Sequence, residues 1–362
     1  MKRILALVFA LALVFGVIAP CEKASAADNT VHKLILTSHT GSTDAMYAAI
    51  VRWAESLMKE SNGRLNIEMH WGGTLAAPRD AVAFVQQGGA DITWSTASLN
   101  PSMFRYGDIL IAYGDLITNT YISTYAALEM YKKLDVISGE YKKAGIKPMA
   151  IHTQNPPIIG GKGAKVQTPA DFKGLSVQSL NKTAIDLLAA FGAAPIAVSI
   201  GDLYENLAKN VCRASIHDAT LFSEQKLYEQ IDWLNTYNYY TSTAFVVMNQ
   251  KKFDSLPADL RQLIDSKFES FSMDLAKDTC DRFVNFLEKI LPTTKVELYN
   301  ASPEMIAAIK AMTETVAIKP YRDFCAKEGQ NADAIMAVAE KALRDGKAKY
   351  GPEYDWFRSM KK

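Results

Sequence analysis

The pattern that most limits the fold is an alternation of short apolar strands with amphipathic helices, which occurs twice along the chain. The first occurrence reads strand, helix, strand, helix, strand over residues 31–37, 45–60, 65–70, 79–87 and 90–95. This order is typical of a mainly parallel sheet that is covered by helices.

The alternation begins again in the second half of the chain. It predicts strands at 146–152, 175–178 and 194–198 and a helix at 183–191. Since 362 residues exceed what one hydrophobic core usually serves, we expect two α/β lobes. Ligands bind outside the carboxyl ends of parallel strands, so the pattern predicts a hinged cleft where strand ends of both lobes meet.

A long helical stretch follows the second unit. Residues 258–291 contain neither Gly nor Pro, and Pro257 and Pro292 bracket them. We predict one helix here that runs across both lobes. Two further helices are expected near 303–328 and 332–344.

The amino-terminal segment has the three parts of a secretory signal peptide. Basic residues stand at 2–3, apolar residues at 4–19 and small residues at 24–26. We predict a leader over 1–26 and a periplasmic location. Two alternatives stay open. The first is a membrane anchor, although the run is shorter than the roughly 20 residues that a spanning helix needs. The second is lipid attachment at Cys21.

Composition and motifs exclude several classes of protein. Lys and Arg number 40 and Asp and Glu 39, for a formal net charge of +1, and these charges are mixed along the chain. Binding to nucleic acid would require clustered basic side chains. No Gly-x-Ser-x-Gly, His-Glu-x-x-His or phosphate-binding glycine loop is present. We therefore expect no nucleic-acid partner, no cofactor and no catalytic residues. An envelope enzyme that works through cleft histidines remains an alternative.

Three of the cysteines lie beyond the predicted leader, at Cys212, Cys280 and Cys325. An oxidising compartment allows one disulfide, and we favour Cys280 with Cys325 because both lie in C-terminal helical stretches. No C-x-x-C or His-rich spacing suggests a metal site, and none is expected.

Short motifs along the chain are ordered and spaced as in one known family. They include Ser61-Asn62-Gly63-Arg64-Leu65, Gly72-Gly73-Thr74-Leu75, Gly88-Gly89-Ala90-Asp91-Ile92, Thr168-Pro169-Ala170-Asp171-Phe172-Lys173-Gly174-Leu175 and Asp202-Leu203-Tyr204-Glu205-Asn206-Leu207. In these motifs the chain resembles the solute-binding proteins of TRAP transporters, the DctP family, over nearly all of its length beyond the leader.

The resemblance implies an extracytoplasmic receptor that closes on one small organic ligand and docks onto the membrane permease subunits of a TRAP transporter. It also implies a periplasmic solute-binding fold with two α/β lobes, hinge crossovers and a long helix spanning both lobes. We predict lobe I over 27–154 and about 243–280, and lobe II over 155–242 and about 281–362 with the C-terminal helices. A monomer is expected.

Two positions depart from the family pattern. The family usually has an Arg that grips the ligand carboxylate where this chain has Gln178, and an Asn where it has His217. A hydrogen bond to a charged group contributes about 1.5–3 kcal/mol, out of about 8 kcal/mol for micromolar binding. Loss of the guanidinium is therefore a large change. Either the ligand is not a simple monocarboxylate, or another cation replaces the Arg.

Candidates for such a cation are histidines near strand ends and two arginines. They are His217, His152, His39, Arg105 and Arg213. A structural alternative exists for two of them, since His39 can cap its turn and His152 can be a hydrogen-bonded core residue. Gln178 supplies amide donors and an acceptor without charge, which suits a hydroxyl, an amide or a neutral ring nitrogen.

Aromatic residues collect where the cleft is expected, at Trp71, Trp94, Tyr237, Tyr239 and Tyr240. We predict ligand contacts from Trp94, Tyr239 and Trp71, and from Thr96 on the Trp94 strand. The ligand is predicted to be neutral or weakly polar with an apolar or aromatic part. An organic acid held by another cation and a sensory binding module are the alternatives.

Overall fold

The structure is a computed structural model that describes residues 29–237, 239 and 241–351. The predicted leader over 1–26, with Cys21, lies outside these residues, as does Tyr240. The elements described below all belong to the compact unit that begins at His32.

Among the described residues, the first sheet has five strands in the order β2-β1-β3-β10-β4. Their bounds are β1 His32–Thr37, β2 Leu65–His70, β3 Ile92–Thr96, β4 Ile146–Thr153 and β10 Thr243–Asn249. β1 runs parallel to β2 and β3, whereas β10 runs antiparallel to β3 and β4. The central β3 is buried throughout, while β2 at the edge starts by alternating between buried and exposed residues.

Helices cover this sheet with their apolar faces. They are α1 Tyr47–Glu60, α2 Ala81–Gln86, α3 Thr120–Lys133 and α4 Asp135–Lys143. On α1 the buried residues recur at helical spacing, and the Trp53 ring stacks on Phe271 with centroids 4.6 Å apart. We call the sheet with these helices lobe I.

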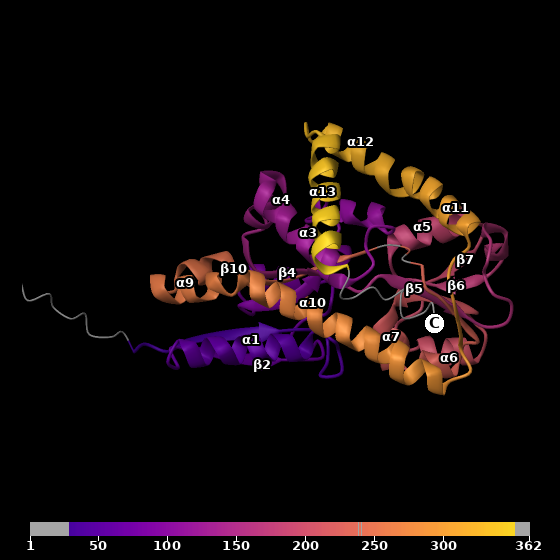
Figure 1. Ribbon diagram of the computed structural model, residues 1–362. Helices are drawn as coiled ribbons and strands as arrows, with labels where there is room; N and C mark the ends of the chain where they lie inside the picture. Colours follow the sequence, from indigo (N-terminus) through magenta and orange to yellow (C-terminus); the bar gives the residue numbers. More distant parts are fainter. Residues whose placement is uncertain (1–28, 238, 240, 352–362) are drawn as a thin grey trace, which may run out of the picture. The chain divides into compact units, whose positions relative to one another are not determined.

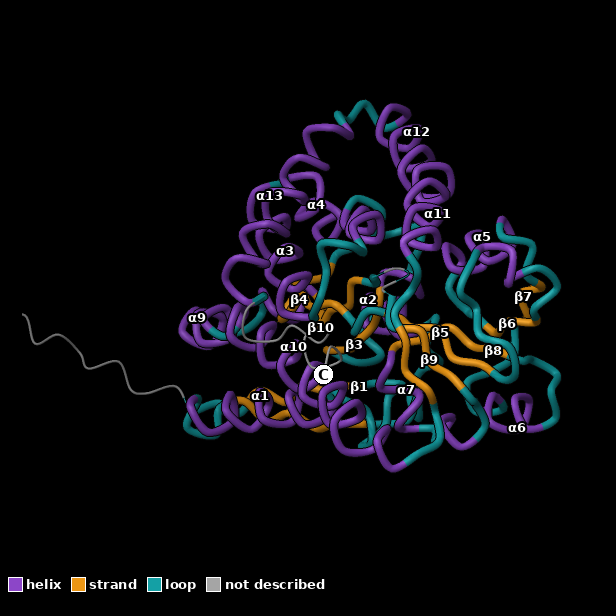
Figure 2. Tube along the Cα trace, turned by 45° about the vertical axis from the view of Figure 1, so that its right-hand side comes forward, coloured by secondary structure: helices purple, strands orange, loops and turns teal. Residues whose placement is uncertain are grey.

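The second sheet runs in the order β11-β9-β5-β8-β6-β7. Its strands are β5 Pro157–Gly161, β6 Ser176–Gln178, β7 Ala194–Ile196, β8 Ala214–Asp218, β9 Trp233–Asn235 and β11 Glu297–Tyr299. With α5 Lys182–Ala190, α6 Leu203–Ala208, α7 Ala219–Glu224 and α11 Pro303–Thr313 it forms lobe II. Figure 2 shows the two separate groups of strands.

The stretch predicted as one helix over 258–291 is divided. α8 Gln250–Asp254 and α9 Ala258–Ser266 precede α10 Phe268–Asn285, and Lys267 between α9 and α10 has φ −90° and ψ −9°. No Gly or Pro marks this break, so the sequence pattern missed it. A π-helical turn, η5 Phe286–Ile290, and the 3-10 turn η6 Leu291–Thr293 end the stretch.

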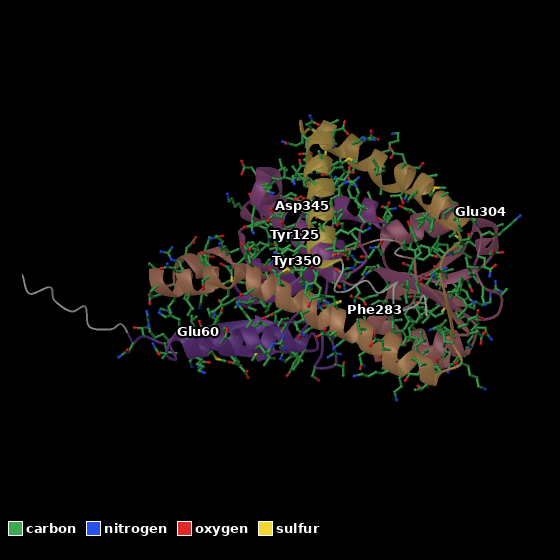
Figure 3. All side chains as sticks on the ribbon, in the orientation of Figure 1. Glu60, Tyr125, Phe283, Glu304, Asp345 and Tyr350 are labelled. Carbon is green, nitrogen blue, oxygen red and sulfur yellow. The ribbon has the colours of Figure 1, made fainter. Side chains whose placement is uncertain are left out.

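Helix α10 contributes to the cores of both lobes. Phe271 and Leu275 belong to a buried cluster with the strands of the first sheet, whereas Cys280 and Phe283 pack with residues of lobe II. Figure 1 shows α10 running from α9 to the neighbourhood of α7, and Figure 3 labels Phe283 on its second half.

The C-terminal helices differ from the predicted division of the lobes. After a π-helical turn, η7 Glu314–Ile318, helices α12 Lys319–Lys327 and α13 Ala332–Tyr350 pack in the core of lobe I, not in lobe II. Gly346 permits this contact, because a Cβ there would lie 3.0 Å from the carbonyl oxygen of Ile122 on α3. The rings of Tyr125 and Tyr350, labelled in Figure 3, have centroids 6.0 Å apart.

The expected Cys280–Cys325 disulfide is wrong. Cys325 is a free, buried thiol on α12 in the core of lobe I, while Cys280 on α10 lies in a different buried cluster. The pair was expected because both cysteines lie in C-terminal helical stretches, but α10 and α12 bring them into different buried clusters. In the part of the chain that the structure describes, no helix has the length and apolarity needed to cross a bilayer.

Candidate functional site

A pocket of about 800 Å³ lies at the strand ends of both lobes. The residues that line it follow β1, β2, β4, β6 and β7 or lie near the carboxyl ends of β3 and β8, and Ser242 precedes the antiparallel β10. The lining consists of His39, Ala77, Pro78, Arg79, Asp80, Trp94, Thr96, Ser98, Leu99, Gln154, Leu180, Asn181, Ser199, Ile200, His217 and Ser242. This is the edge at which the sequence predicted a cleft.

Two glycines hold the loop that carries His39. The N–H of Gly72 donates to the oxygen of Thr40 at 2.8 Å, and the N–H of Gly73 donates to the oxygen of Ser38 at 3.0 Å. Both glycines have φ near +70°, a conformation that other residues rarely adopt. The turn after β2 therefore fixes the loop after β1, and His39 lies with its ring 5.2 Å from that of Trp94.

Trp94 is held in place by a buried histidine. Its Nε1–H donates to Nε2 of His152 at 2.9 Å, and Nδ1 of His152 lies 3.2 Å from the backbone oxygen of Thr153. Because Nε2 accepts, the proton of this imidazole is on Nδ1, which donates to that oxygen. His152 is fully buried and does not line the pocket, so it acts on the pocket through Trp94.

Gln178 and His217 form a similar pair in lobe II. The amide nitrogen of Gln178 donates to the oxygen of Val198 at 2.9 Å, and its Oε1 accepts from the hydroxyl of Ser215 at 3.2 Å. Nε2 of His217 lies 2.5 Å from the same Oε1. Gln178 is fully buried and is absent from the lining, whereas His217 lines the pocket.

The crossover between the lobes is tied to the strand that carries His217. The N–H of Asn155, between β4 and β5, donates to the Asp218 carboxylate at 3.0 Å. The Asn155 side chain accepts from the Thr120 hydroxyl and donates to the oxygen of Thr279 on α10. This hinge segment thus contacts α3, α10 and the end of β8.

The histidines do not supply the cation that the sequence suggested. Burial lowers the pKa of His39, His152 and His217 to about 4 in each case, so all three rings are neutral at neutral pH. Arg105 instead lies over the Phe324 ring at 3.7 Å, and Arg213, which precedes β8, donates to the oxygen of Gly174. Neither arginine lines this pocket.

The arginine that does line the pocket is Arg79, which sequence reasoning missed. It precedes α2, is exposed, and has no ion-pair or hydrogen-bond partner among the described residues. Asp80, its neighbour, also lines the pocket. Arg79 could have been predicted from its position in the loop after β2, at the same sheet edge as His39.

The family follows from a match that covers most of the chain. Residues 37–323 match the model of the bacterial extracellular solute-binding proteins, family 7, known as DctP. The chain belongs to this family. Its fold is that of solved binding proteins of TRAP transporters.

Relatives of this solute-binding protein span almost its whole length. The 2,3-diketo-L-gulonate-binding periplasmic protein YiaO of Escherichia coli is 26% identical over 317 residues, which is 83% of this chain and 89% of YiaO. A TRAP periplasmic solute-binding protein from Desulfovibrio salexigens, solved as an open complex, has a TM-score of 0.78 at 19% identity over 86% of this chain and 95% of its own. One from Bordetella bronchiseptica with bound (R)- and (S)-mandelate has a TM-score of 0.77 at 21% identity over 87% and 99%.

Four predicted ligand contacts of this solute-binding protein do not line the pocket: Gln178 and His152, described above, and Tyr239 and Trp71. Tyr239 is buried in lobe II, where its hydroxyl donates to Asn235 at 3.2 Å and its ring meets Tyr237 edge-on. Trp71 packs on Tyr47 of α1, with ring centroids 4.5 Å apart. The structure thus brings together His39, Trp94, Thr96 and His217 and places Gln178 and His152 directly behind them.

The pocket offers apolar surface and uncharged hydrogen-bonding groups. Leu180 and Ile200 from lobe II are large apolar residues with 46% and 38% of their surface exposed. Hydroxyls come from Thr96, Ser98, Ser199 and Ser242, and amides from Gln154 and Asn181. Within residues 29–237, 239 and 241–351, no group of His, Cys, Asp or Glu is arranged to hold a metal ion.

Proposed function

We propose that this chain is the periplasmic receptor of a TRAP-type transporter and binds one small organic molecule with an apolar or aromatic part. The observation that carries the proposal is the pocket at the strand ends of both lobes, with Trp94 held by His152 in its wall. A flat apolar portion of the ligand would pack between Trp94 and the exposed Leu180 and Ile200. The loaded receptor would then dock onto the membrane permease subunits.

The proposed ligand meets uncharged groups at the lobe II wall. The position at which the family resemblance implied a carboxylate-binding Arg holds Gln178, whose amide is engaged by protein groups. A carboxylate buried there without a cation would lose several kcal/mol of solvation. A hydroxyl or amide fits this wall, and a simple monocarboxylate in the family's usual pose does not.

The test is native mass spectrometry of the purified protein, followed by denaturation and identification of the released molecule. The proposal predicts one molecule per chain with an apolar or aromatic portion. A receptor that retains nothing, and whose thermal unfolding temperature is unchanged by a panel of aromatic acids, their amides and sugar acids, would contradict it.

Arg79 supports a second candidate, a receptor for an organic acid. Its guanidinium lines the pocket without a partner in the described chain, and the ligands named for YiaO and for the Bordetella protein are acids. In this case Arg79→Gln should weaken mandelate binding by about tenfold or more and leave mandelamide binding unchanged. Arg105→Gln is the matched control, because Arg105 lies on Phe324 outside the pocket. Equal losses for both probes would contradict this candidate.

A further inference from the structure

The orientation of the Gln178 amide is fixed by its partners. A backbone carbonyl such as that of Val198 only accepts, so the group 2.9 Å from it is the amide nitrogen of Gln178. The amide oxygen therefore points to Ser215 and His217. An amide oxygen carries no hydrogen, so both of these neighbours must donate to it.

This constraint places the single proton of His217. Nε2, 2.5 Å from the Gln178 oxygen, carries the hydrogen. Burial keeps the ring neutral by lowering its pKa to about 4, so Nδ1 presents a lone pair and no hydrogen. The tautomer of His217 is set by Gln178 and not by the ligand.

Nδ1 of His217 is available to the pocket. Nδ1 has no hydrogen-bond partner in the described part of the chain. The buried side-chain polar atoms that lack a partner do not include it, so Nδ1 is not itself buried. The neighbouring Asp218 carboxylate is occupied by Thr220 and by the N–H of Asn155. His217 is half-buried and lines the pocket, so its Nδ1 is an exposed acceptor at the lobe II wall.

We propose that the Gln178–His217 pair makes this wall selective for a ligand that donates a hydrogen bond, through a hydroxyl or an N–H group, to Nδ1 of His217. This inference rests on the proposed function and specifies the ligand at the same site. A carboxylate or carbonyl oxygen at this point would face the Nδ1 lone pair. An apolar group would leave Nδ1 buried without a partner once the cleft excludes water.

Matched probes that differ by one hydroxyl test the selectivity. The pairs are mandelate with phenylacetate and mandelamide with phenylacetamide, titrated by calorimetry. The hydroxyl-bearing member should bind about tenfold or more tightly in either pair that binds. In His217→Asn the amide both donates and accepts, so the ratio should fall towards one. His70→Asn, on the edge strand β2 and outside the pocket, should keep the wild-type ratio.

Nitrogen NMR of histidine-labelled protein tests the tautomer without any ligand, with the His217 signal assigned through His217→Asn. The inference predicts a neutral ring protonated at Nε2, and a proton on Nδ1 would overturn it. Binding of the probes without a hydroxyl preference would also overturn it. Failure of every probe to bind, with the predicted tautomer observed, would count against the proposed ligand class and not against the acceptor at Nδ1.

Discussion

The indole N–H of Trp94 donates to Nε2 of His152 across the strand that separates them, with 2.9 Å between the two nitrogens. Trp94 lies on β3, His152 on β4, and β10 runs between these strands. Ala244 of β10 pairs with both Thr96 and His152, and Val246 of β10 pairs with Trp94. A fully buried residue thereby sets the position of a pocket ring.

Replacement of His152 should therefore affect both stability and binding. In His152→Leu the indole N–H loses its acceptor, and we expect a loss of about 1–3 kcal/mol in the free energy of unfolding. Ligand affinity should also fall, because Trp94 is no longer fixed. Urea unfolding and calorimetry measure the two effects. His70→Leu is the control, since the His70 side chain lies beside Glu68 at the sheet edge, and should change stability by less than about 0.5 kcal/mol.

The same residue predicts a pH dependence. The pKa of His152 is about 4 in the folded protein against 6.5 unperturbed, so the unfolded chain binds this proton first as the pH falls. Its contribution to stability is present above pH 6.5 and is lost as the pH falls towards 4, by about 3 kcal/mol at most. Wild type should lose more stability than His152→Leu between pH 7 and 4.5 in urea unfolding. Equal losses would show that His152 titrates normally.

Two glycines give a matched test of the packing in lobe II. A Cβ on Gly161 of β5 would lie 2.6 Å from the Trp233 ring and 2.9 Å from both Ala214 Cβ and the Arg213 oxygen, so Gly161→Ala should cost about 1–3 kcal/mol. Gly139 on α4 has no atom within 4 Å of its Cβ position, and Gly139→Ala should stabilise by about 0.5–1 kcal/mol. Chemical unfolding compares the two, and a stable Gly161→Ala protein would contradict the observed contact of β5 with β8 and β9.

The sequence predicted the fold best where hydrophobic periodicity decides the structure. The strand expected at 65–70 is β2 with the same bounds, and the helix expected at 45–60 is α1. The two-lobed α/β fold and the family are confirmed by the matches. Periodicity does not reveal which sheet an amphipathic helix covers, which is why α12 and α13 were assigned to the wrong lobe.

The site was only partly accessible to sequence reasoning. The strand ends predicted that His39, Trp94, Thr96 and His217 lie near one another, and all four line one pocket, because carboxyl ends of strands meet at one edge. The partner of Trp94 lies 58 residues away, and the orientation of Gln178 depends on Val198 and Ser215. Such long-range pairings, and the burial that keeps the histidines neutral, have no local signature.

The most direct test of the account compares ligand affinity in Trp94→Phe and Trp71→Phe. The ligand is the molecule that the purified receptor retains, or otherwise the tightest-binding compound among the aromatic acids, their amides and the sugar acids. Trp94 lines the pocket, and its hydrogen bond to His152 holds its ring in place. Trp71 packs on Tyr47 and does not line the pocket. Calorimetry should show a loss of about tenfold for Trp94→Phe and less than about twofold for Trp71→Phe. Unchanged affinity in Trp94→Phe with a large loss in Trp71→Phe would place the ligand elsewhere and contradict the account.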